Sequence, residues 1–140
     1  MKYKAKYSQL VMPDDANNVG TLFGGQMISW MDLAAAKVAY RFLKGTGASG
    51  ALTRAIDQVE FKEPVYPGEW VNFEGHVSTA GTSSFQVIID AYAEGAKNKK
   101  RLACTAIITM VAVKKEDDGS YSKCSHGRTL WYTMPWIVYP

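Results

Sequence analysis

One stretch of this sequence restricts the possible folds more than any other: the apolar segment from Gly24 to about Lys44. Apolar residues recur there at helical spacing and nearly encircle the predicted helix, which is typical of a helix that is buried on several sides. The main stripe consists of Ile28, Met31, Ala35, Val38 and Phe42. A glycine-rich segment that begins at Gly45 predicts the end of the helix. The fold must therefore bury one long helix.

The segments on either side of this helix have the alternating pattern of β-strands. Turn-forming residues separate them, including a run from Pro13 to Gly20 directly before the helix. The strand candidates are residues 2–12 before the helix and 53–62, 69–78, 83–94 and 101–114 after it. A helix of about 20 residues is about 30 Å long, and an antiparallel sheet wrapped around it would bury it most economically. We therefore predict an α+β fold with one central helix and a sheet of about five to six strands.

Length and composition indicate one soluble domain. The chain has 140 residues, of which 47% are hydrophobic and 21% charged, and this suffices for one hydrophobic core. We expect a single domain over residues 1–140, with residues 116–140 as a C-terminal tail whose aromatic residues pack on a neighbouring surface. The net charge of +3 is too small to indicate nucleic-acid binding.

The distribution of charges and cysteines narrows the cellular setting. The predicted helix contains Asp32, Lys37 and Arg41, and three charges argue against a membrane span. The first residues lack the apolar core of a secretory signal. Cys104 and Cys124 belong to no CxxC pair or cysteine–histidine cluster, so neither a disulfide framework nor a metal site is indicated. These features predict a cytoplasmic protein without a membrane segment, a metal or another cofactor.

Asp32 is the candidate reactive group because it interrupts the apolar run of the helix. A carboxylate without a partner is costly to bury, so such a residue usually has a specific partner or role. Two interpretations are open at this point. Asp32 could be structural, on a solvent-facing strip or paired with Lys37 or Arg41, or it could be catalytic. The residues that precede it favour the catalytic interpretation.

A motif extends from Asn17 to Asp32 and reads N-x-x-G-x-L-F-G-G-x-x-x-x-x-M-D. It resembles the signature of the hotdog-fold acyl-CoA thioesterases, and the resemblance runs from about Val11 to Val113. The hotdog fold is also the architecture predicted above. In that family the helix aspartate acts as nucleophile or general base, and the loop asparagine positions the water or the thioester. The resemblance implies these roles for Asp32 and Asn17.

Gly24 and Gly25 open the predicted helix, where backbone N–H groups lack partners and the helix dipole favours negative charge. They are candidate donors to the oxyanion of thioester hydrolysis, although a double glycine can also be only a tight entry to a helix. Gly25 and Asp32 are about 10 Å apart by helix rise, which is too far to act on one carbonyl within one subunit.

We therefore predict a composite site at a homodimer interface, with Asp32 from one subunit and Asn17 and Gly25 from the other. The resemblance implies that three such dimers assemble into a hexamer. An acyl-CoA is the predicted small-molecule partner.

Coenzyme A phosphates need cationic and hydrogen-bonding contacts. The candidates are Arg54, the basic hairpin 97–101 and the turn of Gly81, Thr82, Ser83 and Ser84, the turn by similarity to the family. Surface lysines are more often simply solvated.

Three other polar residues are expected to have no catalytic role. Asp57 shares a predicted strand face with apolar residues, so we expect it to be partly buried and structural. His76 and His126 are expected at the surface.

The whole pattern favours hydrolysis of acyl-CoA to a free fatty acid and coenzyme A. A serine hydrolase would need a G-x-S-x-G elbow, which the chain lacks. A hotdog dehydratase would use a histidine with an acid, and no histidine precedes His76. A regulator that only binds acyl-CoA would not need a water-activating carboxylate. The dehydratase and the regulator remain as the alternative functions.

Overall fold

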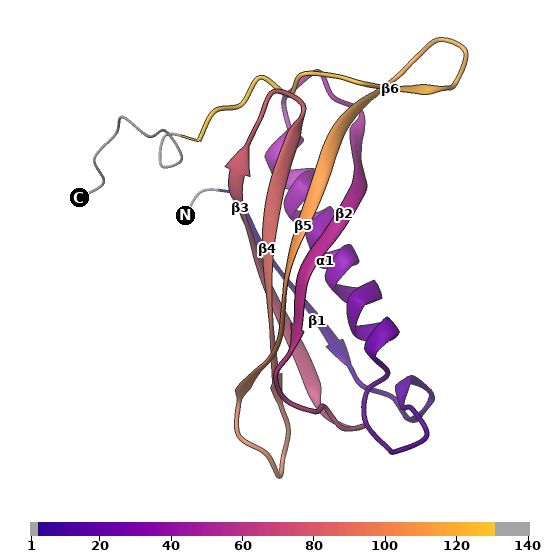
Figure 1. Ribbon diagram of the computed structural model, residues 1–140, viewed down its shortest axis with the longest axis vertical. Coiled ribbons are helices and arrows are strands. Elements are labelled where there is room, and N and C mark those ends of the chain that lie inside the picture. Colours follow the sequence, from indigo (N-terminus) through magenta and orange to yellow (C-terminus); the bar gives the residue numbers. More distant parts are fainter. Residues whose placement is uncertain (1–2, 131–140) are drawn as a thin grey trace, which may run out of the picture.

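The computed structural model describes residues 3–130 as one sheet of strands with one helix packed against it (Figure 1). The elements are β1 Lys4–Leu10, a 3₁₀ turn Pro13–Asp15, α1 Gly24–Leu43, β2 Gly50–Phe61, β3 Trp70–Ala80, β4 Ser84–Glu94, β5 Arg101–Lys115 and β6 Tyr121–Lys123. The two boundaries of the predicted helix agree with those of α1 to within one residue, and each predicted strand matches an observed one. The pattern does not predict β6. No helix in this part of the chain is long and apolar enough to cross a bilayer.

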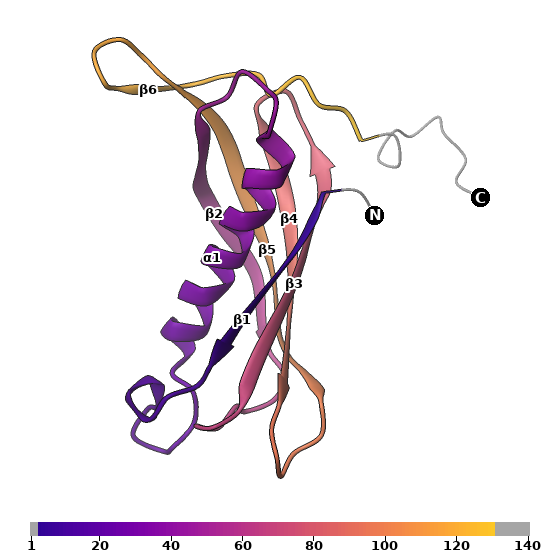
Figure 2. The same cartoon turned by 180° about the vertical axis from the view of Figure 1, so that it is seen from behind.

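The sheet has the strand order β1-β3-β4-β5-β2, with antiparallel neighbours throughout and β6 added to the end of β5. β1 precedes the helix and β2 follows it, yet these two strands form opposite edges of the sheet. Seen from behind, α1 lies along one face of the sheet, between the two edges (Figure 2). A long helix covered by a twisted antiparallel sheet is the hotdog architecture, so the predicted fold is confirmed.

The hydrophobic core lies between α1 and the sheet. The buried residues of α1 are Met27, Trp30, Met31, Ala34, Ala35, Val38, Ala39, Phe42 and Leu43. Leu33 and Tyr40, on the other side of the helix, are 52% and 67% exposed. The prediction that the helix is buried on several sides is therefore wrong for a single chain, because the sheet covers only one side of α1. The exposed apolar side chains are available to another surface.

β2 departs from strict alternation. Its pairing with β5 shifts register between Thr53 and Ala55 and again between Asp57 and Glu60, and Gln58 has a positive φ of 50°. Each irregularity changes the face on which the following side chains lie. Asp57 is exposed in this strand, so its predicted partial burial is wrong.

Residues 124–130, the described end of the predicted C-terminal tail, pack on the domain itself. Leu130 is buried, and so is His126. Nε2 of His126 lies 3.1 Å from the carbonyl oxygen of Ser84, and its ring centroid lies 5.0 Å from that of Phe42. The predicted surface position of His126 is wrong, because these contacts satisfy the ring inside the protein. The aromatic residues expected to pack on a neighbour lie beyond Leu130, outside the described residues.

Candidate active site

The side chain of Asn17 shapes the loop between β1 and α1. Its Oδ1 accepts hydrogen bonds from the backbone N–H groups of Val19 and Thr21, both at 3.0 Å, and its Nδ2 donates to Thr21 Oγ1 at 2.8 Å. Asp15 fastens this loop to the first turn of α1, since its Oδ1 accepts a bond of 3.1 Å from Gln26 Nε2. Asn17 therefore stabilises its own loop, and its second Nδ2 hydrogen meets no acceptor within residues 3–130.

α1 begins at two glycines, without a side-chain cap. Within residues 3–130 no hydrogen-bond acceptor contacts the N–H of Gly24 or Gly25, as expected for the first turn of a helix. Gly25 also avoids a clash, because a Cβ there would lie 2.6 Å from the ring of Phe23. A hollow of about 320 Å³ opens beside Gly24 and continues to the loop after β2. The first turn of α1 thus offers donors at the wall of a cavity.

Asp32 lies two turns farther along α1, on the flank of the helix that faces β2. Its Oδ1 accepts a hydrogen bond of 2.6 Å from Oγ1 of Thr53, an exposed residue of β2. The two ion pairs found in the described part of the chain do not include Asp32. Sequence reasoning missed Thr53, because 21 residues separate it from Asp32 and no local pattern joins a helix to a later strand.

The structural interpretation of Asp32 as an ion-pair partner is wrong. Lys37 and Arg41 are five and nine residues farther along, so they project from the opposite flank of the helix. They reach β1 instead, where Lys37 Nζ donates to the carbonyl of Lys6 at 2.7 Å and Arg41 Nη1 to that of Lys4 at 2.8 Å. The carboxylate therefore faces one edge of the sheet and the two cations face the other.

The 81–84 turn lies far from the Asn17 loop. β3 has 11 residues, about 35 Å by strand rise, and joins the end near that loop to the end that carries the turn. Two backbone groups of the turn form hydrogen bonds within the protein. Gly81 N–H donates to Ser84 O at 2.8 Å, and Thr82 O accepts the N–H of His126. Within one subunit the turn does not meet the glycine pair of α1. Its contact with coenzyme A stays a prediction.

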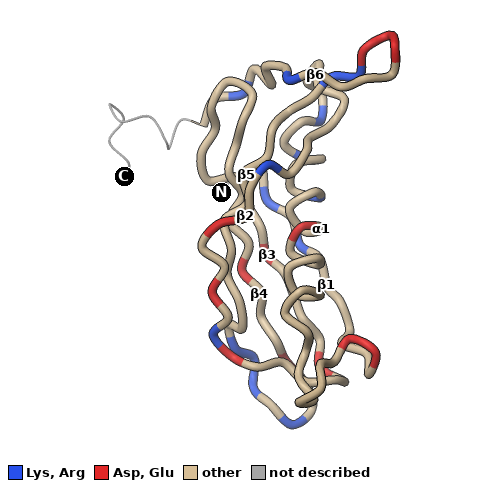
Figure 3. The backbone as a smooth tube through the Cα atoms, turned by 45° about the vertical axis from the view of Figure 1, so that its right-hand side comes forward, with Lys and Arg blue, Asp and Glu red and all other residues tan. Residues whose placement is uncertain are grey.

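The basic hairpin between β4 and β5 lies at the same end of the sheet as the Asn17 loop (Figure 3). Lys97, Lys99 and Lys100 are exposed there. Arg101 differs from them, because its guanidinium pairs with Glu69 at 2.7 Å and so has a structural partner. Arg54, next to Thr53, is exposed.

Within residues 3–130 the remaining candidate groups for nucleophilic or acid–base chemistry form no hydrogen bond or ion pair with Asp32. His76 is on β3 near Asp90, and burial lowers its pKa, while His126 packs near the end of α1. Burial raises the pKa of the Cys104 thiol to about 11, so this thiol is protonated and unreactive at neutral pH. Residues 3–130 contain no group of three His, Cys, Asp or Glu side chains arranged to hold a metal. Independence from metals and cofactors stays a prediction.

Comparison with known proteins adds a sequence match. A model of the thioesterase superfamily matches residues 19–99, more than half of the chain. The uncharacterized acyl-CoA thioester hydrolase YkhA of Bacillus subtilis is 35% identical over 104 residues, which make up 74% of this chain and 58% of YkhA. The chain thus spans less than two thirds of that relative.

Solved structures agree with this match. An acyl-CoA hydrolase from Staphylococcus aureus, in complex with butyryl coenzyme A and coenzyme A, has a TM-score of 0.74 and 29% identity over 89% of this chain and 73% of that one. The hexameric thioesterase y2039 from Yersinia pestis has a TM-score of 0.72 and 29% identity over 84% of this chain and 92% of that one. With its fold, its Asn17–Asp32 motif and these matches, the chain belongs to the thioesterase superfamily.

Proposed function

We propose that this chain is an acyl-CoA thioesterase, which hydrolyses acyl-CoA to a free carboxylic acid and coenzyme A. The observation that carries the proposal is Asp32, a half-buried helix carboxylate oriented by Thr53 and outside both ion pairs of the described residues. Such a carboxylate can take a proton from water or attack a thioester carbonyl. The named activities of the relatives in B. subtilis and S. aureus support the substrate class.

The reaction can follow two routes from this carboxylate. Either water attacks the carbonyl carbon and gives its proton to Asp32, or Asp32 attacks and water later hydrolyses the acyl-enzyme anhydride. In both routes negative charge develops on the carbonyl oxygen and the C–S bond breaks. The sulfur of coenzyme A takes its proton from protonated Asp32 in the first route and from water in the second. The N–H groups of Gly24 and Gly25, at the positive end of α1, suit that oxyanion. Oδ2 of Asp32, opposite the oxygen bonded to Thr53, would meet the water or the carbonyl.

Asn17 is the proposed positioning group for the water or the thioester. Its Nδ2 keeps one hydrogen after bonding Thr21. The S. aureus acyl-CoA hydrolase has been solved as alanine variants of an asparagine and of an aspartate fifteen residues later. Asn17 and Asp32 have the same separation, which supports their assignment as a pair.

A second copy of the chain would complete the site. β2 is an edge strand whose Thr53 end lies beside Asp32, while the ring of Phe61 at its other end lies 3.4 Å from a Cβ position at Gly24. Two copies joined antiparallel through β2 would bring the Phe61 end of one strand to the Thr53 end of the other. Each Asp32 would then face the glycines and Asn17 of the partner subunit. We extend this to a trimer of dimers, since the Yersinia relative is hexameric.

Coenzyme A would bind with its phosphates toward cations near this shared site. Arg54 neighbours Thr53, and the lysines of the 97–100 hairpin lie at the Asn17 end of the sheet. The 81–84 turn could contribute only from another subunit. The dehydratase alternative is weaker, because neither histidine lies near Asp32.

The test is thiol release from a panel of short, medium and long acyl-CoAs. We expect turnover by the native protein and a loss of about 100-fold or more in kcat for Asp32→Asn, which removes the base but keeps the side-chain shape. Asp117→Asn, in an exposed turn before β6, is the matched control and should keep native activity. Tight binding of acyl-CoA without any thiol release would instead support the regulator.

A further inference from the structure

Glu69 is one of only two polar side chains that are buried within residues 3–130, and it is 4% exposed. It directly precedes β3, in the connection that follows β2. The candidate mechanism does not use it. A buried carboxylate needs strong compensation, so its contacts indicate what it is for.

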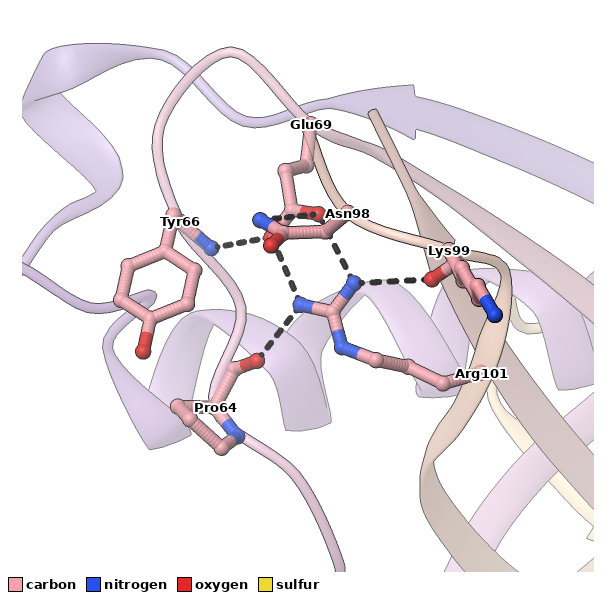
Figure 4. A network of polar contacts seen from close by, with 6 residues as sticks. All are labelled: Pro64, Tyr66, Glu69, Asn98, Lys99 and Arg101. Atoms are coloured by element: carbon pink, nitrogen blue, oxygen red, sulfur yellow. Dashed lines mark hydrogen bonds and ion pairs between the residues drawn. The ribbon is translucent and has the colours of Figure 1, made fainter. Parts of the chain in front are cut away.

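A bidentate ion pair holds Glu69 (Figure 4). Arg101 Nη2 donates to Oε1 at 2.7 Å and Arg101 Nη1 to Oε2 at 2.8 Å. The same Nη2 donates to the carbonyl of Pro64 at 2.8 Å, and the N–H of Tyr66 donates to Oε1 at 2.8 Å. Asn98 Nδ2 approaches Oε2 at 3.4 Å. The pair therefore joins the β4–β5 hairpin to the loop of residues 64–68.

This loop is bonded in turn to both ends of the Asn17 loop. The carbonyl of Val65 accepts the N–H of Leu22 at 2.7 Å, two residues before Gly24. On the other side, Val11 N–H donates to Glu69 O at 2.9 Å, and Gly68 N–H donates to Val11 O at 2.8 Å. The segment that carries Asn17 and leads into the first turn of α1 is thus hydrogen-bonded to the 64–69 connection at both of its ends, at Val11 and at Leu22.

Stability alone does not explain such a pair. Replacing a buried ion pair by apolar residues of similar volume is often neutral or stabilising, so the pair is weak evidence for stability. A fork of two parallel bonds between guanidinium and carboxylate fixes geometry far better than apolar contact does. The Arg101 bonds also hold the pKa of Glu69 below its usual value, so the carboxylate is charged at neutral pH.

We propose that Glu69 and Arg101 are a positioning pair for the reaction, which sets the place of the Asn17 loop and of the Gly24 and Gly25 N–H groups through Pro64 and Val65. The inference rests on the proposed thioesterase function for its kinetic consequence. Its structural consequence, the anchoring of Leu22 to Val65, can be measured without any activity.

The test uses a variant that separates geometry from stability. Glu69→Leu/Arg101→Met keeps an apolar, well-filled site but loses the bonds to Pro64 and Tyr66. We expect a thermal midpoint close to native, amide hydrogen exchange at Leu22 at least about 10-fold faster, and kcat about 10- to 100-fold lower, with KM changed much less. Glu69→Gln keeps an acceptor for Tyr66 N–H, so its exchange rate at Leu22 and its kcat should lie between those of the native protein and those of the double variant. If the double variant does not fold, Glu69→Gln carries the test.

Glu94→Gln is the matched control, because Glu94 is exposed at the same end of the sheet and its carboxylate accepts one hydrogen bond within residues 3–130, from Asn72. It should leave exchange at Leu22 and kcat unchanged. Native exchange at Leu22 together with native kcat in the Glu69 variants would overturn the inference. If the native protein releases no thiol, the proposed function fails, and the Leu22 exchange still decides the positioning claim.

Discussion

The two edges of the sheet differ in what covers them. At β1, Lys37 and Arg41 reach from α1 and bond the outward carbonyls of Lys6 and Lys4. At β2, the flank of the same helix presents Asp32, whose side chain bonds the hydroxyl of Thr53 and no other group among residues 3–130. Lysine and other charged groups on an edge are a common protection against pairing with another chain. Side chains of α1 therefore bond the outward carbonyls of the β1 edge, which we call the closed edge. The β2 edge beside Asp32, the candidate base, receives no such cations from the helix, and we call it the open edge.

The largest effect should come from blocking the open edge. Leu52 is 57% exposed on β2, and in a β2–β2 dimer Leu52→Lys would bury a charge against the Phe61 end of the partner strand. We expect dissociation to monomers and a loss of activity of about 100-fold, since each site would lack its partner half. Sedimentation velocity and thiol release measure both quantities.

Tyr121→Lys adds the same charge on β6, away from the β2 edge, and should preserve assembly and turnover. A Leu52→Lys monomer with full activity would contradict a shared site at β2.

A smaller effect is expected at the hydrogen bond between the helix and β2. Thr53→Val keeps the shape of the side chain but removes the donor to Asp32, and hydrogen bonds to charged groups contribute about 1.5–3 kcal/mol. We expect kcat to fall about 10- to 100-fold, with assembly intact. Thr53→Ser, which keeps the hydroxyl, should recover most of this loss. Equal kcat values for the valine and serine variants would mean that the bond does not orient Asp32.

Opening the closed edge should change assembly rather than catalysis. Lys37→Met/Arg41→Met keeps the apolar stems but frees the carbonyls of Lys4 and Lys6 for pairing with another chain. We expect concentration-dependent species larger than the native assembly in sedimentation, with activity per subunit within about twofold of native. An unchanged size distribution up to high protein concentration would show that these cations do not protect β1.

The smallest effect concerns pH near β1, where His76 pairs across the strands with Lys4. Burial is the main cause of its lowered pKa, which the nearby Asp90 carboxylate partly offsets. As pH falls below about 6.5, the unfolded chain binds a proton at this histidine before the folded chain does, so stability decreases. His76→Gln should therefore lose less thermal stability than the native protein between pH 7.5 and 5.5. Identical pH slopes would contradict the burial of the imidazole.

The sequence predicts the fold well where the pattern is strong and local. The apolar stripe of α1 and the glycine after it place the helix to within one residue, and the long strands follow from their alternation. β6 is missed because three polar or aromatic residues carry no periodic signal. Asp57 is misplaced because two register shifts in β2 break the alternation on which its burial depends.

The candidate site is less predictable, because its parts meet through tertiary contacts. The motif identifies Asn17 and Asp32, but nothing near Thr53 in sequence indicates its bond to Asp32. Burial of His126 depends on packing against Phe42, far away in the sequence. The burial of Glu69 likewise depends on Arg101, which the basic composition of its hairpin suggested as a phosphate contact.

The most direct test of a site shared across β2 is activity in mixed assemblies of two inactive chains. Asp32→Asn removes the base, and Asn17→Asp removes the Nδ2 donor while keeping the acceptor for Val19 and Thr21 N–H. Co-expressed in equal amounts, half of the dimers would contain both chains, and one of their two sites would be native. The account predicts recovery to about a quarter of native activity from chains that are inactive alone. Activity no higher than the sum of the two separate variants would contradict it.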